Sequence, residues 1–267
     1  MILYFSATGN SRYVATALAQ AVGEQTLVDL RPYMKKDARP LTITLSDGES
    51  LGFVFPVHSW GMPKYLADVI TKMHVKGYVA GENYTYMLST CGDDVGCLPK
   101  QWSRVLQKAG VENDAAFSVA MPNTYVLFPG FDIDDSAVSD RKLAEAPAAI
   151  QRIAAQIVNR EKGDFTHHGG MPGFKTRVIH PLFIRYSTSD KPFHVDANLC
   201  IGCGQCVQSC PVDNITLTQK NPCKDDKYMP EWHGRCLTCL ACYHYCPTHA
   251  IAYGSKTQGK HFYTCPF

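Results

Sequence analysis

Two runs of cysteine in the last quarter of the chain have the spacing of iron–sulfur ligands. Both runs read C-x2-C-x2-C-x3-C-P, and the second begins at Cys236, 36 residues after the first begins at Cys200. Three closely spaced cysteines, then a fourth followed by proline, form the pattern that holds four-iron clusters. Structural zinc typically takes four ligands as two separated pairs, and it gives no reason for this repeat. The spacing therefore predicts two [4Fe-4S] clusters.

The fourth cysteine of each run is expected to ligate the cluster of the other run. Cluster one then has the ligands Cys200, Cys203, Cys206 and Cys246. Cluster two has the ligands Cys236, Cys239, Cys242 and Cys210. Cys223 lies between the runs without a partner in the pattern, so we predict that it does not ligate iron.

The segment Cys200–Tyr253 resembles the bacterial ferredoxins that carry two [4Fe-4S] clusters, and the likeness covers almost the whole segment. The resemblance implies a small, pseudo-symmetric α+β unit folded around the clusters. The link between the two runs is longer here than in the smallest of those ferredoxins.

A short loop at the other end of the chain has the composition of a phosphate site. Ser6–Ser11 (SATGNS) follows the expected strand Ile2–Phe5 and opens the expected helix Ser11–Val22. Small residues let backbone N–H groups approach a phosphate, and a helix N-terminus favours its negative charge. The loop is neither a Walker motif nor a dinucleotide fingerprint. A plain helix cap is the alternative interpretation.

Residues 6–11 match the [ST]-x-T-G-x-[ST] loop with which flavodoxins bind the phosphate of FMN, and residues 1–160 as a whole resemble that family. Two later loops, 56–61 and 90–93, follow the third and fourth expected strands, where flavodoxins hold the flavin ring. The resemblance implies FMN, with a flavodoxin-like scaffold that binds no flavin as the alternative. The implied FMN-binding residues are Ser6, Thr8, Gly9, Asn10, Ser11, Pro56, Trp60, Gly61, Thr90, Cys91, Gly92 and Asp93.

Single roles within these loops follow from the same resemblance. Trp60 would stack on one flavin face, or else pack beneath its loop. Gly61 could allow the peptide flip with which flavodoxins bond the reduced ring, because glycine has no Cβ penalty. Flavodoxins often cover the outer flavin face with an aromatic residue from the fourth-strand loop, but Cys91–Cys97 contains none. Tyr125, after the fifth strand, is a substitute; otherwise that face stays open.

Strands and helices that alternate along residues 1–160 must position these loops. The expected strands are Ile2–Phe5, Gln25–Leu30, Leu51–Val57, Tyr84–Thr90 and Ala115–Met121. The expected helices are Ser11–Val22, Lys64–His74, Leu98–Ala109 and Ser139–Arg160, the last starting or kinking near Pro147. Such alternation predicts an α/β doubly wound parallel sheet. The flavodoxin resemblance implies the strand order 2-1-3-4-5, with FMN at its switch point.

The change from alternating elements to dense cysteine divides the chain. We expect a flavodoxin-like domain at 1–160, a linker or strap at 161–193, and a two-cluster ferredoxin domain at 194–267. The apolar stretch Val178–Tyr186 predicts that part of the linker packs as a helix or strap, because a long structureless loop is unusual.

Composition excludes several functions. The formal charge is +2 and no long basic run occurs, so binding of nucleic acid has no electrostatic support. No apolar run approaches the roughly 20 residues of a membrane span. The N-terminal residues lack the features of a signal peptide. Twelve cysteines without such a signal favour metal ligands in a reducing, cytoplasmic setting.

The two halves together resemble a family of flavodoxin–ferredoxin fusion proteins from anaerobes. The resemblance implies an electron-transfer protein that serves a separate redox enzyme, either ferredoxin-dependent or flavin-dependent. A reductase that acts on a small molecule at the flavin is the alternative, and a non-catalytic subunit of a larger complex is a third. No catalytic residue is assigned, because the only acid–base candidate beside the flavin loops, His58, is expected to be structural.

Overall fold

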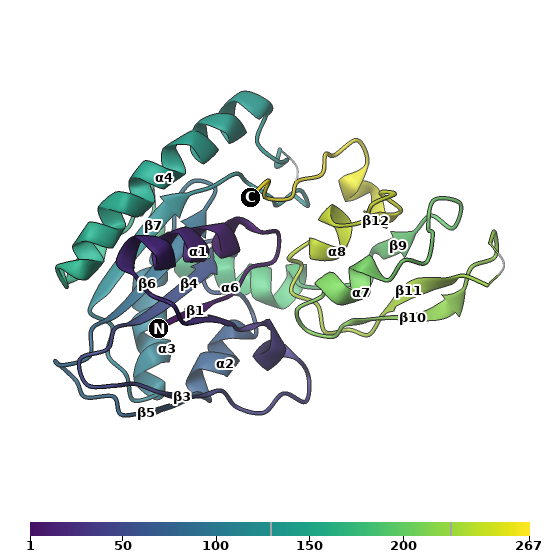
Figure 1. The fold of residues 1–267 in the computed structure, drawn as a ribbon. Coiled ribbons are helices and arrows are strands. Elements are labelled where there is room, and N and C mark those ends of the chain that lie inside the picture. Colours follow the sequence, from purple (N-terminus) through teal and green to yellow (C-terminus); the bar gives the residue numbers. More distant parts are fainter. Residues whose placement is uncertain (129, 225) are drawn as a thin grey trace.

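A computed structural model describes residues 1–128, 130–224 and 226–267. A large α/β half is followed by a smaller half that contains both cysteine runs (Figure 1). We call residues 1–192 the flavin half, after the cofactor that the sequence predicts there, and residues 193–267 the ferredoxin half.

A six-stranded parallel sheet forms the centre of the flavin half. Its order is β2-β1-β4-β6-β7-β8. The strands are β1 (Ile2–Tyr4), β2 (Leu27–Asp29), β4 (Leu51–Pro56), β6 (Thr85–Cys91), β7 (Ala115–Ala120) and β8 (Gly163–Phe165). The first five of these have the predicted order 2-1-3-4-5, which confirms the doubly wound, flavodoxin-like fold class. β8 was not predicted, and it pairs with β7 at the edge of the sheet.

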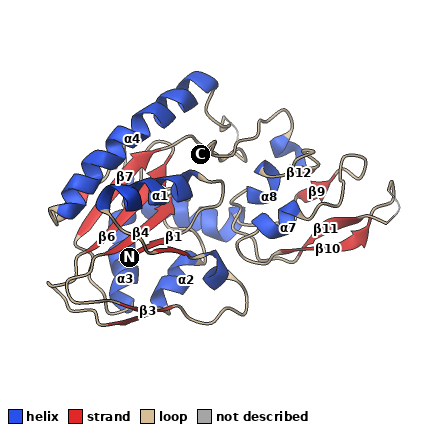
Figure 2. Cartoon of the chain, in the orientation of Figure 1, coloured by secondary structure: helices blue, strands red, loops and turns tan. Residues whose placement is uncertain are grey.

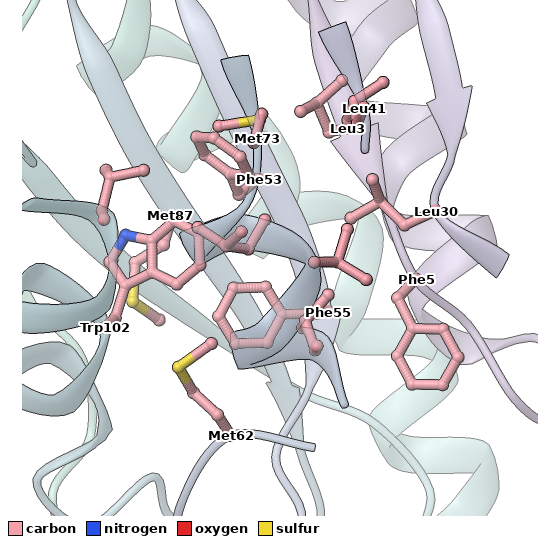
Figure 3. Packing of buried hydrophobic residues seen from close by; sticks show 14 of the residues in the cluster. Leu3, Phe5, Leu30, Leu41, Phe53, Phe55, Met62, Met73, Met87 and Trp102 are labelled. Carbon is pink, nitrogen blue, oxygen red and sulfur yellow. The ribbon is translucent and has the colours of Figure 1, made fainter. Parts of the chain in front are cut away.

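Both faces of the sheet are buried under helices. On one face, α1 (Asn10–Val22) and α4 (Ser136–Val158) pack together. The other face is covered by α2 (Leu66–Thr71) and α3 (Leu98–Lys108). Alternate residues of each strand enter the two cores, as the pleat requires. Figure 3 shows the core on the α2–α3 side, where Trp102 packs against Phe53 and Phe55.

The helix α4 is continuous through Pro147. It begins at Ser136, where the carboxylate of Asp135 accepts a hydrogen bond from the N–H of Val138 at 2.8 Å. A start near Pro147, one of the two interpretations of that proline, is therefore wrong. The observed start lies three residues before the predicted Ser139, because this N-cap sets it there.

The remaining short elements of the flavin half were not predicted in detail. β3 (Thr42–Thr44) pairs in parallel with β5 (His74–Lys76), apart from the main sheet. A short 3-10 turn, η1, covers Arg31–Met34. After β8, residues 172–187 form one helical stretch of alternating α and π turns, which we call the strap helix. Its parts are α5 (Pro172–Phe174), η2 (Lys175–Ile179), α6 (His180–Leu182) and η3 (Phe183–Ser187).

The ferredoxin half contains two small antiparallel sheets and two very short helices (Figure 2). β9 (Phe193–Val195) pairs with β12 (Ile251–Tyr253), and β10 (Ile215–Lys220) pairs with β11 (Tyr228–Trp232). The helices α7 (Gln205–Ser209) and α8 (Ala241–His244) each contain the third cysteine of one run. A final 3-10 turn, η4, covers Gly254–Thr257. Among the described residues, no helix has both the length and the apolar character to cross a membrane.

Candidate functional site

A large cavity opens at the carboxyl ends of β1, β4 and β6, the switch point of the sheet. Its empty volume is about 1070 Å³, including the open mouth. Clefts of several hundred Å³ are the usual size for small-molecule and cofactor sites. Ten of the twelve predicted FMN residues line it: Ser6, Thr8, Asn10, Ser11, Pro56, Trp60, Thr90, Cys91, Gly92 and Asp93.

The loop of residues 6–11 leads into α1 and forms part of the cavity wall. The Ser6 hydroxyl accepts the N–H of Gly9 at 3.2 Å, and the Ser11 hydroxyl bonds that of Thr90 at 2.7 Å. These bonds shape the loop. The first N–H groups of a helix have no partner within the helix, and Asn10 and Ser11, the first two residues of α1, line the cavity. The helix start therefore offers donors and a favourable dipole to a phosphate.

Two predicted residues, Gly9 and Gly61, lie outside the cavity lining. Gly9 has φ +105°, and a Cβ there would lie 2.6 Å from the Cβ of Cys265. A Cβ on Gly61 would lie 2.5 Å from the imidazole of His180. Both glycines therefore allow close packing behind the loops. In the second loop, the left-handed residues are Ser59 and Trp60, not Gly61.

Aromatic side chains form part of the cavity wall. Trp60 and Tyr125 line it as expected, and Phe128, Phe131 and Phe183 also contribute. The Tyr125 ring lies 5.7 Å from the rings of both Phe128 and Phe183, measured between centroids. Sequence reasoning missed the three phenylalanines because they lie outside the flavodoxin motifs, Phe128 and Phe131 in a loop and Phe183 in the strap helix. The apolar run Val178–Tyr186, which contains Phe183, was the one available signal.

The strap helix holds the second and third cavity loops together. The Thr176 hydroxyl donates to the carbonyl of Trp60 and accepts the N–H of Cys97, both at 2.7 Å. Lys175 Nζ lies 2.5 Å from the buried carboxylate of Asp94. Residues 172–187 therefore fix two loops that belong to different strands.

His58 and Cys91 line the cavity in their neutral forms at neutral pH. Burial, together with the nearby His180, lowers the pKa of His58 to about 4. Burial raises the pKa of the Cys91 thiol to about 12, and Asp94 adds to the effect. Neither group is then charged near pH 7, so His58 carries no proton to donate from an imidazolium.

Two smaller cavities gather the cysteines of the two runs. One, with an empty volume of about 330 Å³, is lined by Cys200, Cys203, Cys206 and Cys246, and we call it the cluster-one cavity after the predicted ligand set. The other, of about 310 Å³, is lined by Cys210, Cys236, Cys239 and Cys242, and we call it the cluster-two cavity. Each set takes its fourth cysteine from the opposite run. Cys223 is exposed and lines neither cavity.

The chemistry of these thiols fits a positively charged metal centre. Burial raises the pKa of Cys206 and of Cys236 to about 12, and it raises that of Cys242 well above the ordinary value. Such thiols become ligands when a metal supplies the charge that favours the thiolate. Backbone N–H groups already point at sulfur, with Thr238 N 3.2 Å from Cys236 Sγ and Ala250 N 3.3 Å from Cys246 Sγ. Such hydrogen bonds tune the potential of a bound cluster.

The cluster-two cavity adjoins the large cavity. Cys239 lines both, and its neighbour Thr238 also lines the large one. Val212 and Leu237, from the same part of the ferredoxin half, are buried in the hydrophobic core of the flavin half. None of the four cluster-one cysteines lines the large cavity, and Cys203 is exposed. The sequence left open which of the two predicted clusters lies nearer the large cavity.

Comparison with known proteins supports the two parts separately. Residues 193–216 match the family model described as the 4Fe-4S binding domain, so the chain contains such a domain. The fold and this match define a flavodoxin-like parallel sheet joined to a ferredoxin-type domain.

Solved structures similar to this chain include an azoreductase from Bacillus anthracis str. Sterne, 13% identical, with a TM-score of 0.36. The match covers 60% of this chain and 98% of that one. An NAD(P)H:quinone oxidoreductase from Methanothermobacter marburgensis is 16% identical, with a TM-score of 0.31. That match covers 57% of this chain and 94% of the other.

Proposed function

We propose that this chain is an electron-transfer protein that holds FMN and two [4Fe-4S] clusters and exchanges electrons with a partner redox enzyme. The observation that carries the proposal is the place of Cys239, which lies in the wall of both the large cavity and the cluster-two cavity. When bound, FMN exchanges one or two electrons and each cluster exchanges one. The residues of the chain hold these sites side by side.

FMN fits the large cavity by the chemistry of its lining. Hydroxyl groups and helix N–H groups of the Ser6–Ser11 loop would hold the phosphate. Trp60 and Tyr125 offer aromatic faces to the ring, and the strap helix fixes the loop that carries Trp60. We assign the ten lining residues of the predicted set to FMN contact, with Gly9 and Gly61 shaping the loops from behind.

The arrangement also suggests the order of the sites. Cluster two borders the flavin site through Cys239, whereas the cluster-one cavity is lined by residues of the ferredoxin half alone. Cys203 is exposed, with the half-exposed Ile201 beside it. We therefore assign cluster one to the side that meets the partner enzyme.

We place the protein in the cytoplasm, where reducing conditions keep cysteine thiols free to ligate metal.

A second candidate function is a reductase that acts on a small acceptor at the flavin. It is favoured by Phe128 and Phe131, which line the large cavity and remain 38% and 39% exposed. A planar acceptor could stack against such rings. His58, which also lines this cavity, is neutral near pH 7 and offers an acceptor no imidazolium proton.

Anaerobic stepwise reduction of the loaded chain tests the proposal. Visible and EPR spectra should account for about four electrons per chain, two for FMN and one for each cluster. After rapid mixing with a limiting reductant, redistribution between flavin and cluster signals should not depend on protein concentration. A second-order redistribution would show that the sites do not communicate within one chain. Saturable turnover of a quinone, without a partner protein, would favour the reductase.

A further inference from the structure

The final residues of the chain pack against the back of the Ser6–Ser11 loop. The N–H of Cys265 donates to the carbonyl of Thr8 at 3.0 Å. The N–H of Gly9, on the other side of the same peptide unit, donates to Ser6 Oγ. This peptide is therefore held at both ends. The absence of a side chain at Gly9 lets the Cys265 segment come this close.

Tyr263 makes a second contact with the same loop. Its hydroxyl donates to Oδ1 of Asn10 at 2.8 Å, and Nδ2 of Asn10 donates to the carbonyl of Pro122 at 2.9 Å. Asn10 is buried and lines the large cavity. Both ends of its amide are satisfied only while Tyr263 stays in place, and an unsatisfied buried group is costly.

The same segment is attached to the ferredoxin half. The N–H of Tyr263 donates to Nδ1 of His244 in α8 at 3.1 Å, and Nε2 of His244 donates to the carbonyl of Thr124 at 2.8 Å. Phe262 stacks on Tyr243, with 4.4 Å between ring centroids. In Figure 1 the C-terminal end lies beside the flavin half, close to the start of α1.

We propose that residues 262–265, here called the clasp, position the phosphate loop for FMN and link that loop to helix α8. Tyr263 is the central positioning residue, since it contacts Asn10 through its hydroxyl and His244 through its N–H. The inference rests on the proposed function, because it takes FMN as the ligand of the loop. Through the clasp, FMN binding and the packing of the ferredoxin half should stabilise each other, since linkage is reciprocal.

Affinities for FMN and riboflavin separate this role from a general structural one. Tyr263→Phe removes only the hydroxyl that orders Asn10, so the dissociation constant for FMN should rise about fivefold. Riboflavin lacks the phosphate, so its affinity should not change. Tyr228→Phe, at an exposed tyrosine of the ferredoxin half, is the matched control and should alter neither value. The measurement is quenching of flavin fluorescence on cluster-loaded protein freed of flavin.

Hydrogen exchange tests the reciprocal effect in the unmodified, cluster-loaded chain. FMN should slow amide exchange in residues 262–265, and riboflavin should do so much less. Equal weakening of FMN and riboflavin by Tyr263→Phe, or no weakening, would overturn the clasp. So would exchange that is unchanged by FMN. If the wild-type chain failed to bind FMN, the proposed function would fall first, and the clasp would fall with it.

Discussion

The two halves of the molecule are stabilised in different ways. In the flavin half, every residue of β6 is buried, and large hydrocarbon and aromatic side chains fill both cores. In the ferredoxin half, α7 has five residues and α8 has four, too few for helices that are stable by themselves. Its core includes the buried thiols of Cys200, Cys206, Cys236, Cys242 and Cys246.

This difference indicates how much the stability of each half would depend on its cofactor. A parallel sheet covered on both faces can form a cavity before any ligand arrives. A half whose core includes five buried thiols needs metal to complete it, and its metal-binding free energy then becomes folding free energy. We therefore expect the flavin half to tolerate cofactor loss and the ferredoxin half to unfold without iron.

Removal of iron should produce the largest difference in stability between the two halves. After anaerobic chelation, residues 194–267 should become sensitive to protease, because the buried thiols no longer have a bound metal to hold them together. The parallel sheet should remain resistant. Mass spectrometry of the fragments gives the result. Cys223→Ser, at an exposed cysteine outside both cavities, should keep full iron content. Equal resistance with and without iron would contradict the comparison.

A substitution that leaves a void in the sheet core should strongly lower the stability of the flavin half alone. Trp102 is fully buried, and its indole N–H bonds Asn113 Oδ1 at 2.8 Å. Trp102→Ala should lower the free energy of unfolding by about 3–5 kcal/mol, measured by urea titration with circular dichroism. Val158→Ala, at a side chain that is 64% exposed, is the control. A loss of iron content at low urea in the Trp102 variant would show that the halves unfold together.

Burial of His58 in the flavin half should make the stability of the chain depend on pH. Because its pKa is about 4 in the folded chain and about 6.5 when unfolded, the unfolded state binds more protons between these values. Stability should therefore fall as the pH drops from 7 towards 4, by up to roughly 3 kcal/mol from this group. Urea titrations between about pH 5 and 7 should show a smaller slope for His58→Gln. The same change at the exposed His74 should leave the slope unaltered.

Two glycines with positive φ separate local strain from packing at the flavin site. Gly9→Ala should weaken FMN binding by about tenfold or more, since the new Cβ would meet Cys265 at 2.6 Å in a strained backbone. Gly23 has φ +71° with nothing within 4 Å of the added Cβ. Gly23→Ala should cost on the order of 1 kcal/mol of stability and leave FMN affinity unchanged. Similar FMN affinities in the two variants would rule out a packing role for Gly9.

The smallest effect is expected at the two cysteines of the flavin half. Burial holds the pKa of Cys91 at about 12, so it remains a thiol, and Cys97 does not line the large cavity. Cys91→Ala and Cys97→Ala should each take up the same number of electrons as the wild type in a reductive titration. Two fewer electrons in both variants would instead indicate a redox-active disulfide.

The sequence predicted the local motifs because their chemistry is local. Cysteine spacing within one short turn limits which metal centre can bind, and the Ser6–Ser11 loop must follow its strand directly. The hydrophobic strands also indicated the parallel sheet, since strands buried on both faces are apolar throughout. The helix α4 begins at Ser136, three residues before the predicted Ser139, because the side chain of Asp135 caps its first turn.

Most contacts between distant segments had no signal in the sequence. Strand β8, the phenylalanines of the cavity wall and the bond from Tyr263 to Asn10 each depend on how separate elements pack. The two cysteine runs are nearly equivalent as sequence. Only the tertiary structure brings Cys239 to the large cavity and leaves Cys203 exposed, because Val212 and Leu237 of the ferredoxin half are buried in the core of the flavin half.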